Sequence, residues 1–176
     1  MGSRLDLIER NIEALRRSAE VLKRIDDGLY TASNPALPGG SIGKHLRHQL
    51  DAYASFLEGR PRRRVDYDAR ERDPAVETRR AEGMAHLRRT IRALHDLAGE
   101  AAARSLRVRM EGSASAAAGT WARSSEEREL SYLLSHTIHH DALIAVFLRS
   151  ASHDPGAGFG VAPGTLRHWK RLRRAV

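Results

Sequence analysis

The chain has 176 residues, of which 41% are hydrophobic and 30% are charged, a composition that is typical of a globular protein and excludes a disordered one. It contains no cysteine, which excludes disulfides, thiolate metal sites and a protein thiol nucleophile. The formal net charge of +8 comes almost wholly from arginines that are scattered along the chain. Because these cations do not form one basic block, we do not expect specific nucleic-acid binding.

The amino-terminal residues lack an apolar signal core, and no run of residues reaches membrane-spanning length. We therefore expect a cytoplasmic protein with no membrane partner. Leucine and alanine are plentiful, whereas aromatic residues make up only 5% of the chain, which favours an all-α fold. The length predicts a single domain over residues 1–176 with a substantial core.

The first predicted helix covers residues 4–28, where apolar residues recur at alternating steps of three and four, as on the inner seam of a helix bundle. A turn-rich break follows at residues 31–40. A second helix is expected from Ser41, its N-cap, to Gly59. Residues 60–73 then form a charged connector.

A third helix is expected to begin at Asp73, an N-cap followed by a proline in the first helical position, and to continue to about Ala103. A long crossover follows at residues 105–123. Residues 106–110 within it have the alternating pattern of an extended piece.

Ser124 and Glu127 fit a capping box that starts a fourth helix, which ends near Ala151. A passage rich in glycine and proline then leads to a short basic C-terminal helix. The predicted fold is therefore all-α: a four-helix bundle with a long crossover loop before the last bundle helix, and a short C-terminal helix.

The fourth predicted helix carries three histidines in the run Ser-His-Thr-Ile-His-His-Asp. His136 and His140 are one helical turn apart, so both imidazoles project from one face and can reach a single ion. Both lie inside the apolar stripe of this helix, whereas His139 lies on its flank. Buried imidazoles need polar partners, and a metal ion would serve both. The alternative is a pair of surface or water-bonded core histidines.

A third ligand must come from another helix, and the second helix offers His45 and His48. Periodicity slightly favours His45, which lies nearer the apolar stripe. The small residues Ala52 and Ser55 beside His48 would leave room for a metal ion instead. The pattern alone leaves this choice open.

The second helix also carries part of a longer motif, Ser-Ile-x5-His-Leu-x-Asp. At the matching spacing this chain has Ser41, Ile42, His48 and Asp51. Together with the His-x3-His pair, these residues resemble the DinB/YfiT-like family of small four-helix-bundle metalloproteins, which is not the DNA polymerase that shares the DinB name. The resemblance implies that His48, and not His45, joins His136 and His140 as a metal ligand. The Arg-Gly-Gln that often follows the pair in that family is Asp-Ala-Leu here, at residues 141–143.

Three neutral imidazoles with an open position suit a divalent metal ion, with Zn²⁺ expected first and Ni²⁺ or Fe²⁺ as alternatives. Such an ion can activate a thiol or a water molecule. The resembled family includes S-transferases and an isomerase that use low-molecular-weight thiols, which implies a small-molecule substrate and an external thiol here. A metal-dependent hydrolase and a non-catalytic metal- or ligand-binding stress protein are the alternatives. Bundles of this type often pair through helix faces, so a homodimer is also an expectation.

Three further residues are candidates for supporting the metal ligands. Asp51 could orient His48 as a neighbouring carboxylate, with a helix-surface position as the alternative. Glu129 lies two turns before His136 and could approach as a general base, or it could remain solvated. His139, on the flank of the pair, could contact the ligands from outside.

The charged connector supplies candidates for substrate binding. Tyr67, Arg70 and Arg72 could contact an anionic substrate, because guanidinium forks match carboxylates. The alternative is a connector whose side chains are simply solvated.

Overall fold

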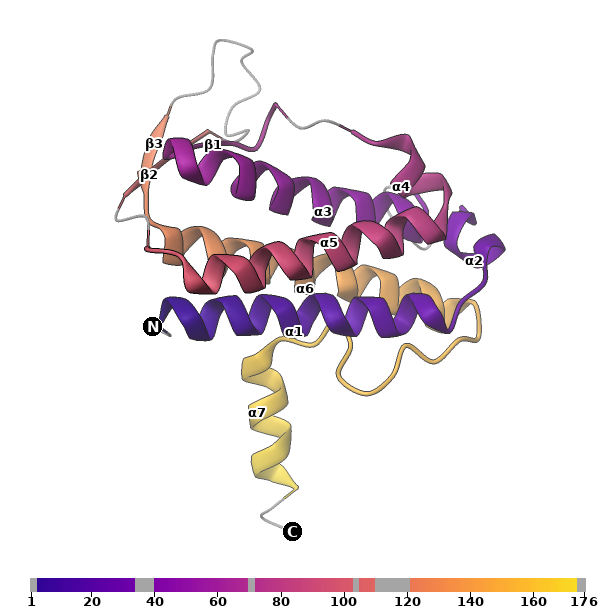
Figure 1. The fold of residues 1–176 in the computed structure, drawn as a ribbon. Helices are drawn as coiled ribbons and strands as arrows, with labels where there is room; N and C mark the ends of the chain where they lie inside the picture. The colour runs from indigo at the N-terminus through magenta and orange to yellow at the C-terminus, as the bar shows by residue number, and fades with distance from the viewer. Residues whose placement is uncertain (1–2, 34–39, 70–71, 103–104, 110–120, 174–176) are drawn as a thin grey trace.

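The computed structural model describes residues 3–33, 40–69, 72–102, 105–109 and 121–173. Four long helices form a bundle in which α1 and α3 each pack against both α5 and α6 (Figure 1). The bundle helices are α1 (Arg4–Lys23), α3 (Ile42–Gly59), α5 (Arg80–Gly99) and α6 (Glu126–Ser150). The predicted helical-bundle fold is confirmed, and this packing places α3 beside α6.

Capping side chains fix where the bundle helices begin. Ser41 caps α3 by accepting a hydrogen bond from the Lys44 amide at 3.2 Å, as the sequence predicted. The predicted start of α6 is wrong by one residue. Ser125, and not Ser124, is the N-cap, and its hydroxyl accepts a hydrogen bond from the Arg128 amide at 3.2 Å.

The first predicted helix ends earlier than expected, at Lys23. The chain then turns, and the Asp26 carboxylate accepts a hydrogen bond from the Leu29 amide at 2.7 Å. This cap starts a separate short helix, α2 (Asp27–Thr31). The apolar periodicity that extended the prediction to residue 28 therefore spans two elements.

The third predicted helix is also divided, into α4 (Pro74–Thr78) and α5, because Arg79 has an extended backbone. Asp73 caps α4 as expected. The short helix rests directly on α3, where a Cβ added at Gly43 would lie only 2.0 Å from the Glu77 carbonyl oxygen. The α5 helix ends at Gly99, before the predicted end near residue 103.

A small three-stranded sheet closes the end of the bundle at which α3 finishes (Figure 1). A single 3₁₀ turn, η1 (Arg60–Arg62), leads into its first strand. Its strands are β1 (Arg64–Asp66), β2 (Leu106–Arg109) and β3 (Ala122–Ser124). The central strand β2 pairs parallel with β1 and antiparallel with β3. The extended piece expected in the crossover is thus β2, and the connector before it contains a strand that the sequence interpretation missed.

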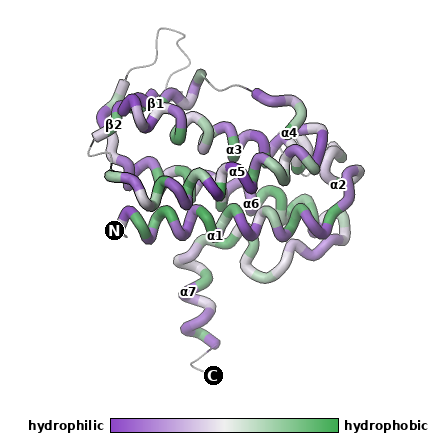
Figure 2. Tube along the Cα trace, in the orientation of Figure 1, coloured by the Kyte–Doolittle hydropathy of each residue, from purple (hydrophilic) through white to green (hydrophobic). Residues whose placement is uncertain are grey.

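Hydrophobic and hydrophilic residues alternate along each bundle helix (Figure 2). The core also contains a buried polar contact between three helices. The Tyr53 hydroxyl of α3 donates to Asn11 Oδ1 of α1 at 2.6 Å and lies 3.0 Å from Thr137 Oγ1 of α6. Because buried polar groups are stable only when they are paired, these bonds favour one register of α3 against α6.

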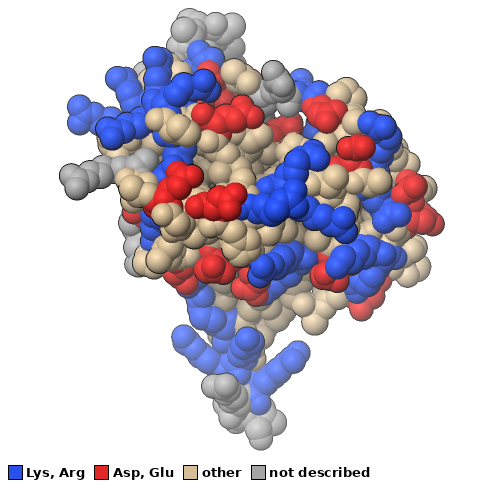
Figure 3. All heavy atoms as spheres, in the orientation of Figure 1, with Lys and Arg blue, Asp and Glu red and all other residues tan. Residues whose placement is uncertain are grey.

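The last helix, α7 (Pro163–Leu172), projects from the bundle beside α1 (Figure 1). None of its residues is buried, and both Trp169 and Leu172 are exposed. Cationic side chains gather along it and near the sheet, while acidic and basic groups mix over the bundle (Figure 3). Within the described ranges, no helix is both long enough and apolar enough to cross a membrane.

Candidate metal centre

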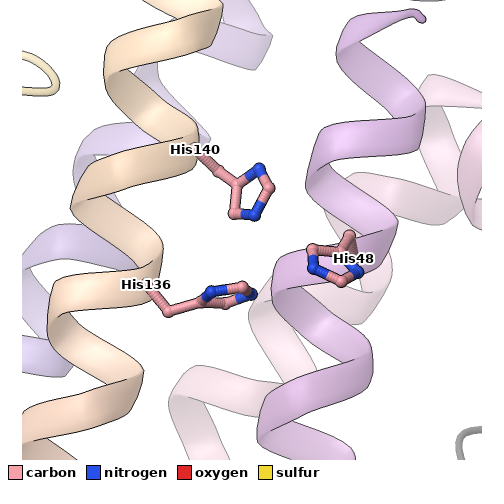
Figure 4. Close-up of side chains that lie close together, drawn as sticks. All are labelled: His48, His136 and His140. Atoms are coloured by element: carbon pink, nitrogen blue, oxygen red, sulfur yellow. The ribbon is translucent and has the colours of Figure 1, made fainter. Parts of the chain in front are cut away.

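The neighbouring helices α3 and α6 bring three histidines together between them (Figure 4). His48 comes from α3, and His136 and His140 come from successive turns of α6. One ring nitrogen of each lies within 4.8 Å of the other two. The rings are correspondingly close, with centroid distances of 4.6–4.9 Å.

The donor set fits a divalent metal ion. Burial, followed by the imidazoles of His136, His48, His45 and His139, lowers the pKa of His140 to about 2. The His140 imidazole is therefore neutral at physiological pH, and neutral imidazole is the form that binds metals. Whereas His140 is buried, His48 and His136 are partly exposed, so the cluster has an open side. Three protein ligands with an open side are characteristic of catalytic metal sites.

His45 lies one turn before His48 on α3 and is outside this group of three. It is only 6% exposed, and its Nδ1 lies 2.8 Å from Nδ1 of His140. The two alternatives that periodicity left open therefore occupy different places: His48 belongs to the group, and His45 contacts Nδ1 of His140.

Asp51 is buried and does not have the surface position that the sequence left open. Its carboxylate lies 3.8 Å from Nε of Arg47, whose guanidinium also bonds the Glu77 carboxylate at 2.5 Å. This ion-pair cluster joins α3 to α4.

Glu129 is fully buried, which corrects the solvated interpretation. Its carboxylate accepts hydrogen bonds from Tyr67, Ser124 and Arg128, those from the Tyr67 hydroxyl and the Arg128 guanidinium each measuring 2.8 Å. Aromatic ring contacts connect Tyr67, which donates to Glu129, with His136. Tyr67 meets Tyr132 edge-on at 5.2 Å, and Tyr132 stacks on His136 at 5.5 Å.

Of the three connector residues expected to contact an anion, the structure describes Tyr67 and Arg72. Tyr67 is buried, and its hydroxyl is engaged by Glu129. Burial and the Glu129 carboxylate raise the pKa of Tyr67, so this hydroxyl remains a donor. Arg72 is exposed, and Arg70 lies outside the described residues.

His139 lies on the flank, as the helical phase predicted. It is exposed, and its ring meets that of His140 edge-on at a centroid distance of 5.1 Å. It does not belong to the group of three.

The sequence interpretation missed a buried carboxyl group next to the site. Asp141 accepts hydrogen bonds from Ser18 Oγ at 3.1 Å and from Gln49 Nε2 at 3.0 Å. Burial raises its pKa to about 7. A signal was present, because Leu133, Thr137 and Asp141 are spaced by four residues and follow one buried row of α6.

A comparison with models of known protein families found a match that covers most of the chain. The model of the DinB family matches residues 1–160. The chain belongs to the DinB family. No curated protein and no solved structure matched the chain. In this DinB-family protein, the matched residues include the whole bundle and all three clustered histidines, whereas α7 lies beyond them.

Proposed function

We propose that His48, His136 and His140 hold a divalent metal ion, with Zn²⁺ first and Ni²⁺ or Fe²⁺ as alternatives, and that the chain is a metal-dependent S-transferase. It would join an external low-molecular-weight thiol to a small electrophile. The observation that carries the proposal is that three ring nitrogens lie within 4.8 Å of one another. His48 and His136 are only partly buried, so the cluster is partly exposed. When bound, the ion would act as a Lewis acid and lower the pKa of a coordinated thiol or water molecule.

The chain's own residues would prepare this reaction by holding fixed donors on a side of the cluster that is only partly buried. The neutral His140 offers a lone pair from the buried side. The stack of Tyr132 on His136 restrains a second donor ring. Fixed donors favour catalysis because they need little reorganisation when the reactants meet.

The thiol has to come from outside, because the chain contains no cysteine. In the transfer, sulfur forms a bond to the electrophilic carbon, and the bond from that carbon to a halide or epoxide oxygen breaks. The departing group keeps the bonding electron pair, and the thiol proton passes to solvent or to the opened oxygen. These requirements favour a small electrophile with one good leaving group.

Turnover of the metal-loaded protein tests the proposal. Glutathione, mycothiol and bacillithiol should each be offered with a reactive halide and with an epoxide. We expect at least one thiol to be conjugated faster with protein than without it, and the gain to disappear in His48→Ala. His95→Ala is the control, because His95 is exposed and contacts Arg16 at 3.1 Å.

Other outcomes would replace the proposal. Metal-dependent ester cleavage without any thiol would assign a hydrolase. A protein that binds metal but turns over neither kind of substrate would be a binding protein.

A further inference from the structure

His45 has a close polar contact with the most buried of the three clustered histidines. Its Nδ1 lies 2.8 Å from Nδ1 of His140, which is hydrogen-bond distance. Their ring planes are inclined by 48° at a centroid distance of 5.1 Å, so this contact is not a stack. Both side chains are buried.

The contact restricts where the hydrogens can lie. A neutral imidazole has one N–H and one nitrogen with a lone pair. Two Nδ1 atoms at 2.8 Å therefore share a single hydrogen, donated by one ring to the other. The other ring nitrogen of His140, Nε2, points toward His48 and His136 (Figure 4).

If Nε2 of His140 is to offer its lone pair to an ion, Nδ1 of the same ring must carry the hydrogen. His45 must then accept that hydrogen at its own Nδ1 and keep its hydrogen on Nε2. The opposite arrangement would place a hydrogen on Nε2 of His140, between the ring and the ion.

We infer that His45 is a positioning residue that accepts the Nδ1–H of His140 and so holds His140 in the tautomer and ring orientation that bind metal. This inference rests on the proposed metal site. A carboxylate, a backbone carbonyl or a water molecule usually holds a metal-binding histidine in this way. The carboxyl group nearest in sequence, Asp141, is already bonded to Ser18 and Gln49.

The role predicts an asymmetry between two amide substitutions. In His45→Asn the side-chain oxygen stands about where Nδ1 of the imidazole stood, so it can accept the same hydrogen. In His45→Gln the amide lies one bond farther out, at the level of Nε2. His45→Ala removes the acceptor altogether.

Metal affinity is the first readout, measured on metal-free protein by competition with a chromophoric chelator for Co²⁺ and Zn²⁺. We expect His45→Ala and His45→Gln to raise the Kd by about 10- to 100-fold, and His45→Asn to recover most of the loss. His139→Ala is the matched control, because the ring of His139 lies at the same centroid distance of 5.1 Å from His140. That variant loses a ring contact but no hydrogen-bond acceptor, so its Kd should rise by less than that of His45→Ala.

The N–H itself is the second readout. In the Co²⁺-substituted protein, the ring N–H of His140 should give a paramagnetically shifted proton signal that exchanges slowly with water. The exchange should be much faster in His45→Ala, while circular dichroism verifies that the variant is folded.

Three results would overturn the inference. Unchanged affinity and exchange in a folded His45→Ala variant would remove the role of His45 and leave the three-histidine site intact. Coordination of Co²⁺ by His45 itself would make it a ligand. A wild-type protein that takes up neither ion would overturn the proposed function together with this inference.

Discussion

Tyr132 stacks on His136, with ring centroids 5.5 Å apart and ring planes inclined by 25°. The Tyr132 ring also meets Tyr67 edge-on, and the Tyr67 hydroxyl donates to the buried Glu129. The candidate metal ligand His136 is thus restrained by Tyr132, which contacts Tyr67, and Tyr67 is in turn bonded to the fully buried carboxylate of Glu129.

The stack should contribute to metal affinity. Aromatic pairs add about 0.5–1.5 kcal/mol beyond their buried area, so we expect Tyr132→Ala to raise the metal Kd by roughly two- to tenfold. Tyr132→Phe keeps the ring and should bind metal as the wild type does. Equal affinities for the alanine variant and the wild type in a chelator competition would show that the stack does not restrain His136.

The Tyr67 hydroxyl should stabilise the fold, because it donates to a carboxylate that has no access to water. Tyr67→Phe should lower the free energy of unfolding by about 1.5–3 kcal/mol, as is typical of hydrogen bonds to charged groups. Tyr30→Phe is the matched comparison, since the buried Tyr30 hydroxyl donates to the uncharged Val76 carbonyl at 2.5 Å. Urea unfolding should show a smaller loss for Tyr30→Phe, and the reverse order would contradict this account of Glu129.

Gly43 should tolerate no side chain, because a Cβ there would lie 2.0 Å from the Glu77 carbonyl oxygen and 2.8 Å from Tyr30 Cε1. Gly43→Ala must push α4 away from α3, and we expect a loss of about 1–3 kcal/mol in the free energy of unfolding. Gly99→Ala is the control, since nothing lies within 4 Å of its added Cβ. If the two variants are equally stable in urea, the close contact of α4 with α3 is wrong.

Two neighbouring groups should give the metal-free protein opposite responses to acid. The pKa of His140 is about 2 in the fold, below its ordinary value of 6.5, so the stability linked to it is complete above pH 6.5 and declines as the pH falls. The pKa of Asp141 is about 7 in the fold, above its ordinary value of 3.8. The stability linked to Asp141 is therefore complete below pH 3.8 and is lost as the pH rises through 7.

Removing either group should expose the effect of the other. When the pH is lowered from 7.5 to 5.5, metal-free Asp141→Asn should lose about 1–2 kcal/mol of unfolding free energy relative to the wild type. The variant keeps the loss linked to His140 but lacks the gain linked to Asp141. His140→Leu should gain relative to the wild type over the same interval. Urea unfolding in a chelator at both pH values measures the two differences, and equal slopes for all three proteins would contradict the assignment.

Much of the bundle could be predicted from local signals. Ser41 and Asp73 act as caps because each hydroxyl or carboxylate lies close to its own helix's free amides, which requires no knowledge of the rest of the fold. The break at Arg79 could not be predicted in this way. It comes from the packing of α4 on α3, and nothing in the run from Pro74 to Arg80 terminates a helix by itself.

The strand in the connector had a weak signal that the high charge concealed. Arg64 and Asp66 are polar, while Val65 and Tyr67 between and after them are buried, which is the alternation of a half-buried strand. The length of the run, only three paired residues, made it easy to take for a solvated loop.

The three-histidine cluster could be predicted only in part. The helical phase predicts that His136 and His140 lie on one face, because their spacing depends on one helix alone. The choice of His48 required the family resemblance. The contact between His45 and His140 depends on the register of α3 against α6, which tertiary packing decides.

The metal content of the purified protein tests the central claim most directly. Native mass spectrometry, supported by elemental analysis, should find one divalent ion per chain in the wild type and in the His95→Ala control. His48→Ala and His136→Ala should be folded and should lose that ion. Full metal content in both of these variants, or a wild-type chain that takes up no ion from buffered Zn²⁺, would contradict the three-histidine site.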